Sequence, residues 1–514
     1  MMLRLGTLLL LPALLGCASR YERSADREGD RIMQEGEASV DAFRTNLVRP
    51  TADVPAREDR APPVDVPETL TLEDALRIAT GCNRDYKTQR DAFFLAALSL
   101  GLTRRNFEQW VFTGSLSNNL TDGEEIPLFE TTALAFTGTR AVLPTGASLT
   151  ISGALTQVHQ PDPETTVTGS ASFTQPLLRG AGKSIAWEPL TLAERGLVYQ
   201  ARSFEIYRQG FTISIIQQYA NLVSQQRSVK NAENRVASND YVQRQAKALF
   251  RLEMGTQTDV FRAEREYRNA QNSLLDAQQG YQLALDQFKI TLGLPLSATF
   301  DVVDDIPLPE DLDPPIEGAV EAALANRLDL VTARQQTEDA ERGVRVARNA
   351  LLPDLDFTAS YNGIAAGNTL AEFGFEPSNW EFGLSLEIPL DRKAERNAYK
   401  SALIAYEQSK RSLQQTEDNA ILSVRDALRR LKQTRLQIQN DKDNIKTIER
   451  LLLKADLENR AGRGSNRDVV EATNDLADAK NSLNDRYVSY LIDTLNLQQQ
   501  MGLLFVDKEG RVVR

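Results

Sequence analysis

The sequence predicts a duplicated α+β membrane protein in which long α-helical coiled-coil hairpins alternate with β-strands. Three observations predict this fold: the two halves of the chain repeat each other, their longest segments have helical heptad spacing, and the segments between these alternate at period two. The chain has 514 residues, 41% of them hydrophobic, and a formal net charge of −12. It shows no clustered basic face, which argues against a nucleic-acid partner.

The N-terminus reads as a secretory leader. Arg4 precedes an apolar run over residues 5–15, which is too short for a transmembrane helix. The run ends in Leu14-Leu15-Gly16-Cys17, which resembles a bacterial lipobox, so we expect a signal peptide over 1–16 and an acylated Cys17. The residue after the cysteine is Ala18 and not an aspartate, which in similar bacterial lipoproteins favours sorting of the protein to the outer membrane. The alternative is a plain signal peptide with an incidental cysteine.

Composition places the domain boundaries. We expect an N-terminal tether over 17–66, where charged and then proline-rich stretches argue against a core. A second proline-rich and acidic patch divides the remainder into two repeats. The predicted order is a first repeat over 67–301, a linker over 302–315, a second repeat over 316–504 and a tail over 505–514.

The repeat is visible without gaps. Shifting the sequence by 209 residues pairs residues 251–294 with 460–503 and gives 13 identities in 44 positions. The fronts of the halves also correspond, since Asn83-Arg84-Asp85 resembles Asn326-Arg327-Leu328-Asp329. Each half is therefore predicted to contain a helix, a strand region and a long helical hairpin.

The helices are predicted from spacing. Opening helices are expected over 72–106 and 316–350, and a mostly helical stretch over 186–253 would be about 100 Å long, far beyond a globular helix. The returning segment has apolar residues at intervals of three and four, which is a heptad seam that the second half repeats. The seam residues are Val260, Ala263, Tyr267, Ala270, Leu274, Ala277 and Tyr281, then Val469, Ala472, Leu476, Ala479 and Leu483.

The strands are predicted from alternation. Phe382, Leu384, Leu386 and Ile388 alternate with polar or small residues, and a similar pattern runs over 355–362. The first half is longer here, with candidate strands near 111–120, 131–143, 147–158 and 166–175. Alone, the pattern fits a transmembrane barrel and a soluble β-sandwich edge equally well. A solitary coiled coil explains the long helices but not the strands between them.

In this arrangement the chain resembles the TolC-type outer membrane efflux proteins over about residues 68–504. The resemblance rests on the duplicated units and on a Gly-x-x-x-Asp-Val turn in each hairpin. It also rests on three junctions between helix and strand: Gln175-Pro176-Leu177-Leu178-Arg179-Gly180, Ile388-Pro389-Leu390 and Arg348-Asn349-Ala350-Leu351-Leu352-Pro353. The first strand region, about 70 residues, exceeds what the family usually needs and implies either an extra hairpin or a long external loop.

The resemblance implies an exit duct of a tripartite efflux or type I secretion system, which exports small molecules or polypeptides passively. It implies a homotrimer whose strands form one shared transmembrane β-barrel in outer-membrane lipid and whose helices form a periplasmic tunnel. The implied partners are a periplasmic adaptor protein and an inner-membrane pump of the RND or ABC type. The alternatives are a structural periplasmic coiled-coil lipoprotein and the adaptor subunit itself.

The hairpin turns are the candidate sites, since in this family they form the tunnel's periplasmic end and contact the adaptor. The candidate tip residues are Arg251, Gly255, Thr258 and Asp259 in the first hairpin and Arg460, Gly462, Arg463, Gly464 and Arg467 in the second. We expect the two turn glycines, Gly255 and Gly464, to permit the backbone reversal. Asp259 and Asp468 suit the start of the returning helix, and this capping role is the alternative to any function at the pore.

Asp468 and Glu471 match the positions of two acidic residues that face the constriction in the family. Three copies would place rings of carboxylates in the lumen and favour cations. The first hairpin has Arg262 where the second has Glu471, so the rings would come from one repeat only. The arginines at 460, 463 and 467 are expected to pair with acids of the neighbouring hairpin.

Little in the sequence suggests an enzyme. His159 is the single histidine, in a loop-like run, and Cys82 has no partner once Cys17 is acylated. A phosphate-binding loop at 180–184 is excluded because Leu177 stands where the pattern needs glycine. We therefore expect no catalytic residue, no cofactor and no metal site.

Overall fold

The computed structural model describes residues 26–34, 67–123, 126–140, 143–160, 164–253, 255–305, 312–366, 378–461, 464 and 466–513. The expected signal peptide, Cys17, Gly462 and Arg463 lie outside these described residues. None of the described helices is both long and apolar enough to cross a membrane.

The chain divides into two compact units, each of which is considered by itself. The first unit takes its described residues from 1–49, 92–202 and 332–414, and it contains the large β-sheet. The second unit takes them from 50–91, 203–331 and 415–514, and it contains the ends of both helical hairpins.

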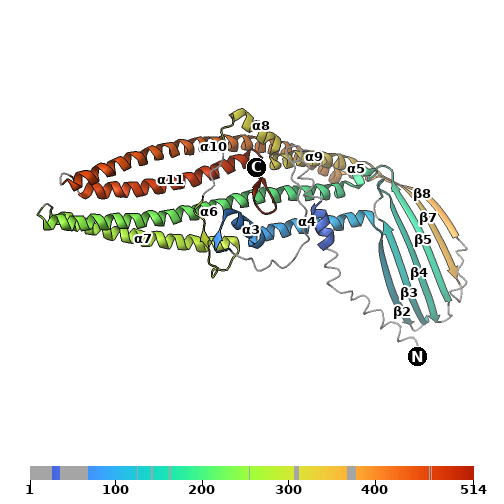
Figure 1. Ribbon diagram of the computed structural model, residues 1–514. Coiled ribbons are helices and arrows are strands. Elements are labelled where there is room, and N and C mark those ends of the chain that lie inside the picture. Colours follow the sequence, from blue (N-terminus) through green and yellow to red (C-terminus); the bar gives the residue numbers. More distant parts are fainter. Residues whose placement is uncertain are drawn as a thin grey trace, which may run out of the picture. The chain divides into compact units, whose positions relative to one another are not determined.

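The sheet of the first unit has six antiparallel strands in the order β2-β3-β4-β5-β7-β8 (Figure 1). Four strands come from the first half of the chain and two from the second half. Their bounds are β2 Val111–Gly123, β3 Ile126–Arg140, β4 Ser148–Gln160, β5 Glu164–Pro176, β7 Asp354–Ala366 and β8 Ser378–Glu387. The long first strand region therefore contains an additional pair of strands in the sheet, which answers the question that the sequence left open.

Helices flank the strands in each half. In the first half they are α3 Leu72–Cys82, α4 Arg84–Glu108, α5 Lys183–Ala186, α6 Glu188–Arg251 and α7 Gln257–Leu292. In the second half they are α8 Ile316–Asn326, α9 Leu328–Asn349, α10 Lys393–Arg460 and α11 Asn466–Gln500. Two small sheets complete the second unit, β1 Thr69–Leu70 with β6 Asp301–Val302 and β9 Phe505–Val506 with β10 Val512–Val513.

The opening helices differ from the prediction, because each is broken into two. Asn83 ends α3 and caps α4, since its Oδ1 accepts a hydrogen bond from the Tyr86 amide at 2.8 Å. In the second half the break falls at Arg327, which donates to Asp329, Ser423 and Gln500. The expectation of continuous helices over 72–106 and 316–350 was wrong because these breaks depend on partners distant in sequence.

A glycine that ends each hairpin lies against each break. Gly293 and Gly502 have φ values of 76° and 71°, the left-handed conformation that ends a helix. A Cβ on Gly293 would lie 2.4 Å from the carbonyl oxygen of Cys82. A Cβ on Gly502 would lie 2.8 Å from the carbonyl carbon of Asn326. The two halves thus share the same close backbone contact.

The main core lies in the second unit. Tyr219 and Phe288 are almost fully buried there with aliphatic residues of α3, α6, α7 and α11. The Tyr219 hydroxyl oxygen lies 3.2 Å from the carbonyl oxygens of both Leu70 and Val303 and can donate its hydrogen bond to either of them. The predicted seam faces the protein interior, since Ala263, Ala270 and Ala472 are at most 2% exposed. The helical heptad prediction is confirmed.

In the first unit a charged network joins α6 to α9. Arg195 and Tyr199 of α6 both donate to the carboxylate of Asp339, at 2.7 and 2.5 Å. Arg342 of α9 bonds both carboxylate oxygens of the buried Glu188. Because Glu188 and Asp339 are each paired with an arginine, the network holds the two helices in one register.

Part of the expected tether is structured. Residues 26–34 form a helix in which Ile32 is 1% exposed. The ring of Phe94 on α4 occupies the space beside Gly29, where a Cβ would lie 2.3 Å from Phe94 Cε2. This stretch of the expected tether therefore packs on α4.

Candidate functional site: the two-faced sheet and the hairpin ends

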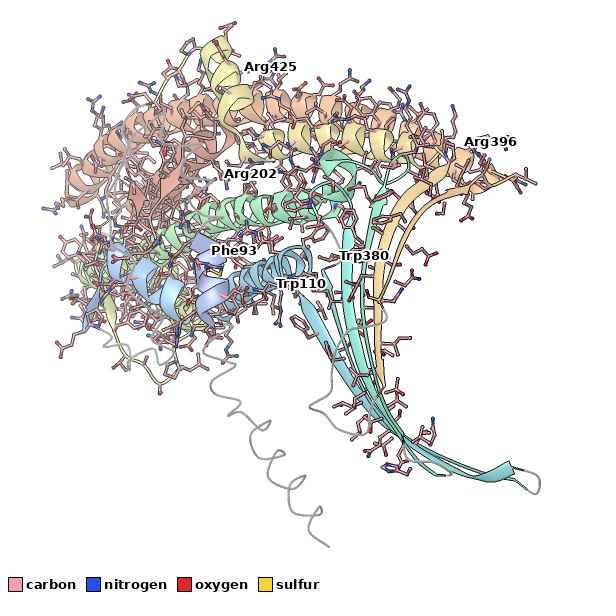
Figure 2. The ribbon with its side chains drawn as sticks, turned by 90° about the vertical axis from the view of Figure 1, so that its right-hand side faces the viewer. Phe93, Trp110, Arg202, Trp380, Arg396 and Arg425 are labelled. Atoms are coloured by element: carbon pink, nitrogen blue, oxygen red, sulfur yellow. The ribbon has the colours of Figure 1, made fainter. Side chains whose placement is uncertain are left out.

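One face of the sheet is apolar. The ladder aligns Phe112, Ile151, Ala171, Tyr361 and Trp380 in one row on that face. A parallel row contains Leu116, Leu134, Leu155 and Val167. Several of these side chains are strongly exposed, Phe112 at 72% and Trp380 at 65%. Figure 2 shows Trp110, just before β2, and Trp380, on β8.

Glycines and phenylalanines fit together on this face. A Cβ on Gly138 would lie 2.4 Å from Phe112 Cε1, and a Cβ on Gly153 would lie 2.5 Å from Phe136 Cε1. Each ring therefore covers the glycine of the adjacent strand, an arrangement that stabilises glycine within a sheet. The face stays continuous and apolar without bulky side chains at every position.

The opposite face is polar. Thr150, Ser152, Ser170 and Ser172 alternate with the apolar residues, and the Ser152 and Ser170 hydroxyls hydrogen-bond at 2.5 Å. Toward the far end of the strands the apolar face also becomes polar, where Thr132 hydrogen-bonds His159 at 3.2 Å. A sheet that separates lipid from an aqueous lumen has this arrangement, with an exposed apolar band on one face and polar side chains on the other. A soluble sandwich edge would not leave so large an apolar face uncovered.

The first hairpin end contains a capping box. Thr256 accepts a hydrogen bond from the Asp259 amide, and Asp259 in turn accepts from the Thr256 amide and hydroxyl. Arg262 lies 3.7 Å from the Asp259 carboxylate. Arg251, the last residue of α6, and Thr258 are both exposed. Asp259 thus has the capping role that its position suggested.

The glycines have different roles from those expected. Neither Gly255 nor Gly464 has a positive φ, and among the described residues of the first turn Glu253 is left-handed, with a φ of 60°. A Cβ on Gly464 would lie 2.8 Å from the Asn459 amide nitrogen, whereas Gly255 has 3.4 Å to Leu249 Cβ. Gly464 is needed for close approach of two backbone segments, and Gly255 is not.

Near the end of the second hairpin, Arg460 and Arg467 each form an ion pair within their own helix. Arg460 bonds Asp456 at 2.8 Å, and this carboxylate raises the pKa of the Arg460 guanidinium. Arg467 lies 3.4 Å from Glu471 on α11, and both side chains are more than half exposed. Such a pair contributes only about 0.3–0.5 kcal/mol, so a competing partner can readily break it.

Asp468 and Glu471 lie on one exposed face of α11. Asp468 is in the first turn, at the position that Asp259 occupies in α7. The same exposed face continues through Asp475 and Asp478, which the sequence analysis missed. Their spacing of three, seven and ten residues from Asp468 could have identified them. No metal-binding group of acids, histidines or cysteines occurs among the described residues.

Comparison with known proteins finds a family to which part of the chain is similar. Residues 319–503, which include α10 and α11, match the family model described as outer membrane efflux protein. The chain is 24% identical over 341 residues to the outer membrane protein TolC of Escherichia coli, covering 62% of this chain and 66% of TolC. Over these residues the chain is therefore similar to the outer membrane efflux proteins. Its match spans just under two thirds of the length of that relative.

A second sequence relative and two solved outer membrane channels also resemble the chain, and the solved channels show its fold. TolC of Vibrio cholerae is 21% identical over 329 residues, covering 62% of this chain and 74% of that one. The CmeC outer membrane channel of Campylobacter jejuni has a TM-score of 0.63 at 17% identity, covering 84% of this chain and 85% of CmeC. The MtrE outer membrane channel of Neisseria gonorrhoeae has a TM-score of 0.60 at 14% identity, covering 84% and 89%. The predicted fold and the predicted resemblance to the outer membrane efflux proteins are confirmed.

Proposed function

We propose that this protein is the outer-membrane exit duct of a multi-component efflux or secretion system. The observation that carries the proposal is the sheet with one exposed apolar face and one polar face. Burying an exposed phenylalanine or leucine side chain in lipid is favourable by about 1.5–3 kcal/mol. The apolar face therefore suits contact with outer-membrane lipid, and the polar face suits a water-filled lumen.

Three copies of the chain would form one channel. A single sheet ends in strands with unpaired backbone groups, which lipid does not tolerate, so neighbouring copies must pair their edges. The hairpins would then surround a periplasmic tunnel that an adaptor protein contacts at the hairpin ends. The energy would come from an inner-membrane pump of the RND or ABC type, and the duct itself would be passive, without catalysis.

Acylation of Cys17 would anchor each copy to the membrane. Two or more acyl chains make attachment stable, so the anchor would hold each copy before the channel closes. Packing of the 26–34 helix on α4 would keep the anchor beside the first unit.

The exposed carboxylates of α11 would narrow and charge the periplasmic end. Asp468 and Glu471 are within reach of solvent, and three copies would produce rings of negative charge. The weak Arg467–Glu471 pair suits a contact that a docking partner exchanges. The proposed positions around which the adaptor docks are Arg251, Gly255, Thr258, Asp259, Arg460, Gly462, Arg463, Gly464 and Arg467.

The test is single-channel conductance of the purified protein in a planar bilayer. We expect a small cation-selective conductance whose preference for K⁺ over Cl⁻ falls several-fold in the Asp468→Asn/Glu471→Gln variant. Asp259→Asn, which removes a carboxylate from the equivalent position in α7, is the control and should keep the selectivity. If the unmodified protein, the double variant and the control all show the same ion selectivity, Asp468 and Glu471 have a structural role only.

The second candidate is a structural periplasmic coiled-coil lipoprotein. The long helices favour it, but such a rod has no use for an exposed apolar sheet face. If a folded oligomer never inserts into the bilayer, this second function replaces the first.

A further inference from the structure

The two halves of the chain contribute unequally to the sheet. Two strands, β7 and β8, lie between α9 and α10, whereas four strands, β2 to β5, lie between α4 and α6. The additional pair is not a separate hairpin. Strand β3 pairs with β2 over its length and with β4 on its other side, and β4 pairs with β5. Both halves therefore build one continuous ladder.

The additional strands have the same two faces as the others. Leu134 of β3 and Leu155 of β4 lie in the row that begins at Leu116 and ends at Val167. Leu134 is 51% exposed on this apolar face. The neighbouring Ala135 and Ala154 face the polar side, in the register of Ser115 and Thr168. A loop outside the membrane would not need this alternation.

The outer strands of the sheet suit pairing with further copies of the same chain. In the described part of the sheet, β2 and β8 each have one neighbouring strand. Strand β2 leads away from α4 and β8 leads toward α10, so they run in opposite directions. The β8 of one copy can therefore extend the antiparallel ladder through β2 of the next, with apolar rows meeting apolar rows.

We propose that the membrane part of this channel is an 18-stranded barrel, in which three copies each contribute six strands. This inference rests on the proposed trimeric duct and adds its width. Barrel diameter grows roughly linearly with strand number. The proposed barrel is therefore about one and a half times as wide as a barrel to which each half of each chain contributes only two strands. Barrels of 16 to 18 strands leave an aqueous channel, and the outer opening is then too wide to select among small solutes.

The test is a cryo-electron microscopy map of the purified oligomer in lipid nanodiscs. A three-fold barrel with 18 strands supports the inference. A three-fold barrel of 12 strands, with two strands of each chain outside the wall, overturns the inference and leaves the proposed duct intact. A particle without a barrel overturns both.

Single cysteines provide a second test in intact cells, in a Cys82→Ser background. Leu134→Cys and Ala135→Cys are adjacent on β3 but face opposite sides of the sheet. We expect a water-soluble maleimide to label Ala135→Cys at least tenfold faster than Leu134→Cys. The matched pair on β8, Leu384→Cys and Ser385→Cys, should show the same ratio. Equal labelling within the β3 pair, with a normal ratio on β8, would place the additional strands outside the barrel wall.

Discussion

The side chain of Asn83 donates a hydrogen bond of 2.7 Å from Nδ2 to the carbonyl oxygen of Thr291. The same side chain caps the start of α4 through Oδ1. Asn83 is also the residue at which α3 ends, so this one buried residue links the end of α3, the start of α4 and the end of α7. Asn83→Ala should lower the free energy of unfolding by about 1–3 kcal/mol, because a cap and a buried hydrogen bond are lost.

Asn326→Ala is the control for this variant, since Asn326 corresponds to Asn83 in sequence but is not the residue that binds across the second break. The unfolding temperature of each variant is measured in detergent as the midpoint of the thermal loss of its helical circular dichroism signal. Equal unfolding temperatures for the two variants would contradict the role given to Asn83.

Gly464 should be the less replaceable of the two turn glycines. A Cβ there would lie 2.8 Å from the Asn459 amide nitrogen and 2.9 Å from the Glu458 carbonyl carbon. Because both are backbone atoms, Gly464→Ala should loosen the second hairpin end at a cost of about 1–3 kcal/mol. Trypsin should then cut faster near Arg460, while Gly255→Ala should leave cleavage near Arg251 unchanged. Equal cleavage in both variants would remove the steric argument.

The two faces of β8 should respond differently to a positive charge. Leu384 is 69% exposed on the apolar face, and Ser385 lies beside it on the polar face. An arginine that faces the middle of a bilayer costs about 2–4 kcal/mol. Leu384→Arg should therefore reduce the folded oligomer recovered from outer membranes, and Ser385→Arg should not. Size-exclusion chromatography of detergent extracts measures the recovery, and similar losses would argue against a lipid-facing surface.

Two half-buried acids, Asp329 and Asp493, should affect the free energy of unfolding with opposite sign. Burial raises the pKa of Asp329, but the hydrogen bond and charge of Arg327 outweigh it, so the pKa lies below its ordinary value. Its contribution to stability is present above the unfolded pKa of about 3.9 and is lost as the pH falls through the folded pKa. Burial raises the pKa of Asp493 above its ordinary value, and the Thr434 hydrogen bond offsets this only in part. That contribution is present at low pH and is lost as the pH rises through the folded pKa.

At pH 7, Asp329→Asn should therefore lower the unfolding temperature by several degrees, and Asp493→Asn should raise it slightly or leave it unchanged. Near pH 3 both differences should shrink. Unfolding temperatures measured in detergent at the two pH values check the signs.

Local pattern predicted most elements of this fold. The alternation of Phe382, Leu384 and Leu386 is a property of neighbouring residues, and so is the seam through Ala263 and Ala270. The helix breaks could not be predicted in the same way. Asn83 depends on Thr291, and Arg327 depends on Gln500, both far along the chain.

The hairpin ends were predicted in part. The capping role of Asp259 follows from its distance to Thr256 in sequence, whereas the left-handed Glu253 and the approach of Gly464 to Asn459 depend on the path of the turn. The roles proposed for Asp468 and Glu471 depend on neighbouring copies of the chain, about which the pattern within one chain carries no information.

The glycine contacts at the two helix breaks have a consequence for how the duplicated halves have diverged. Both breaks rest on the same backbone contact, through Gly293 and Gly502. The side chains around them are different, since the first break uses the neutral amide of Asn83 and the second uses the charged pair of Arg327 and Asp329. Acid neutralises only the second. The two copies of this helix break therefore share one backbone contact but differ in side-chain chemistry, which is neutral in the first half and charged in the second.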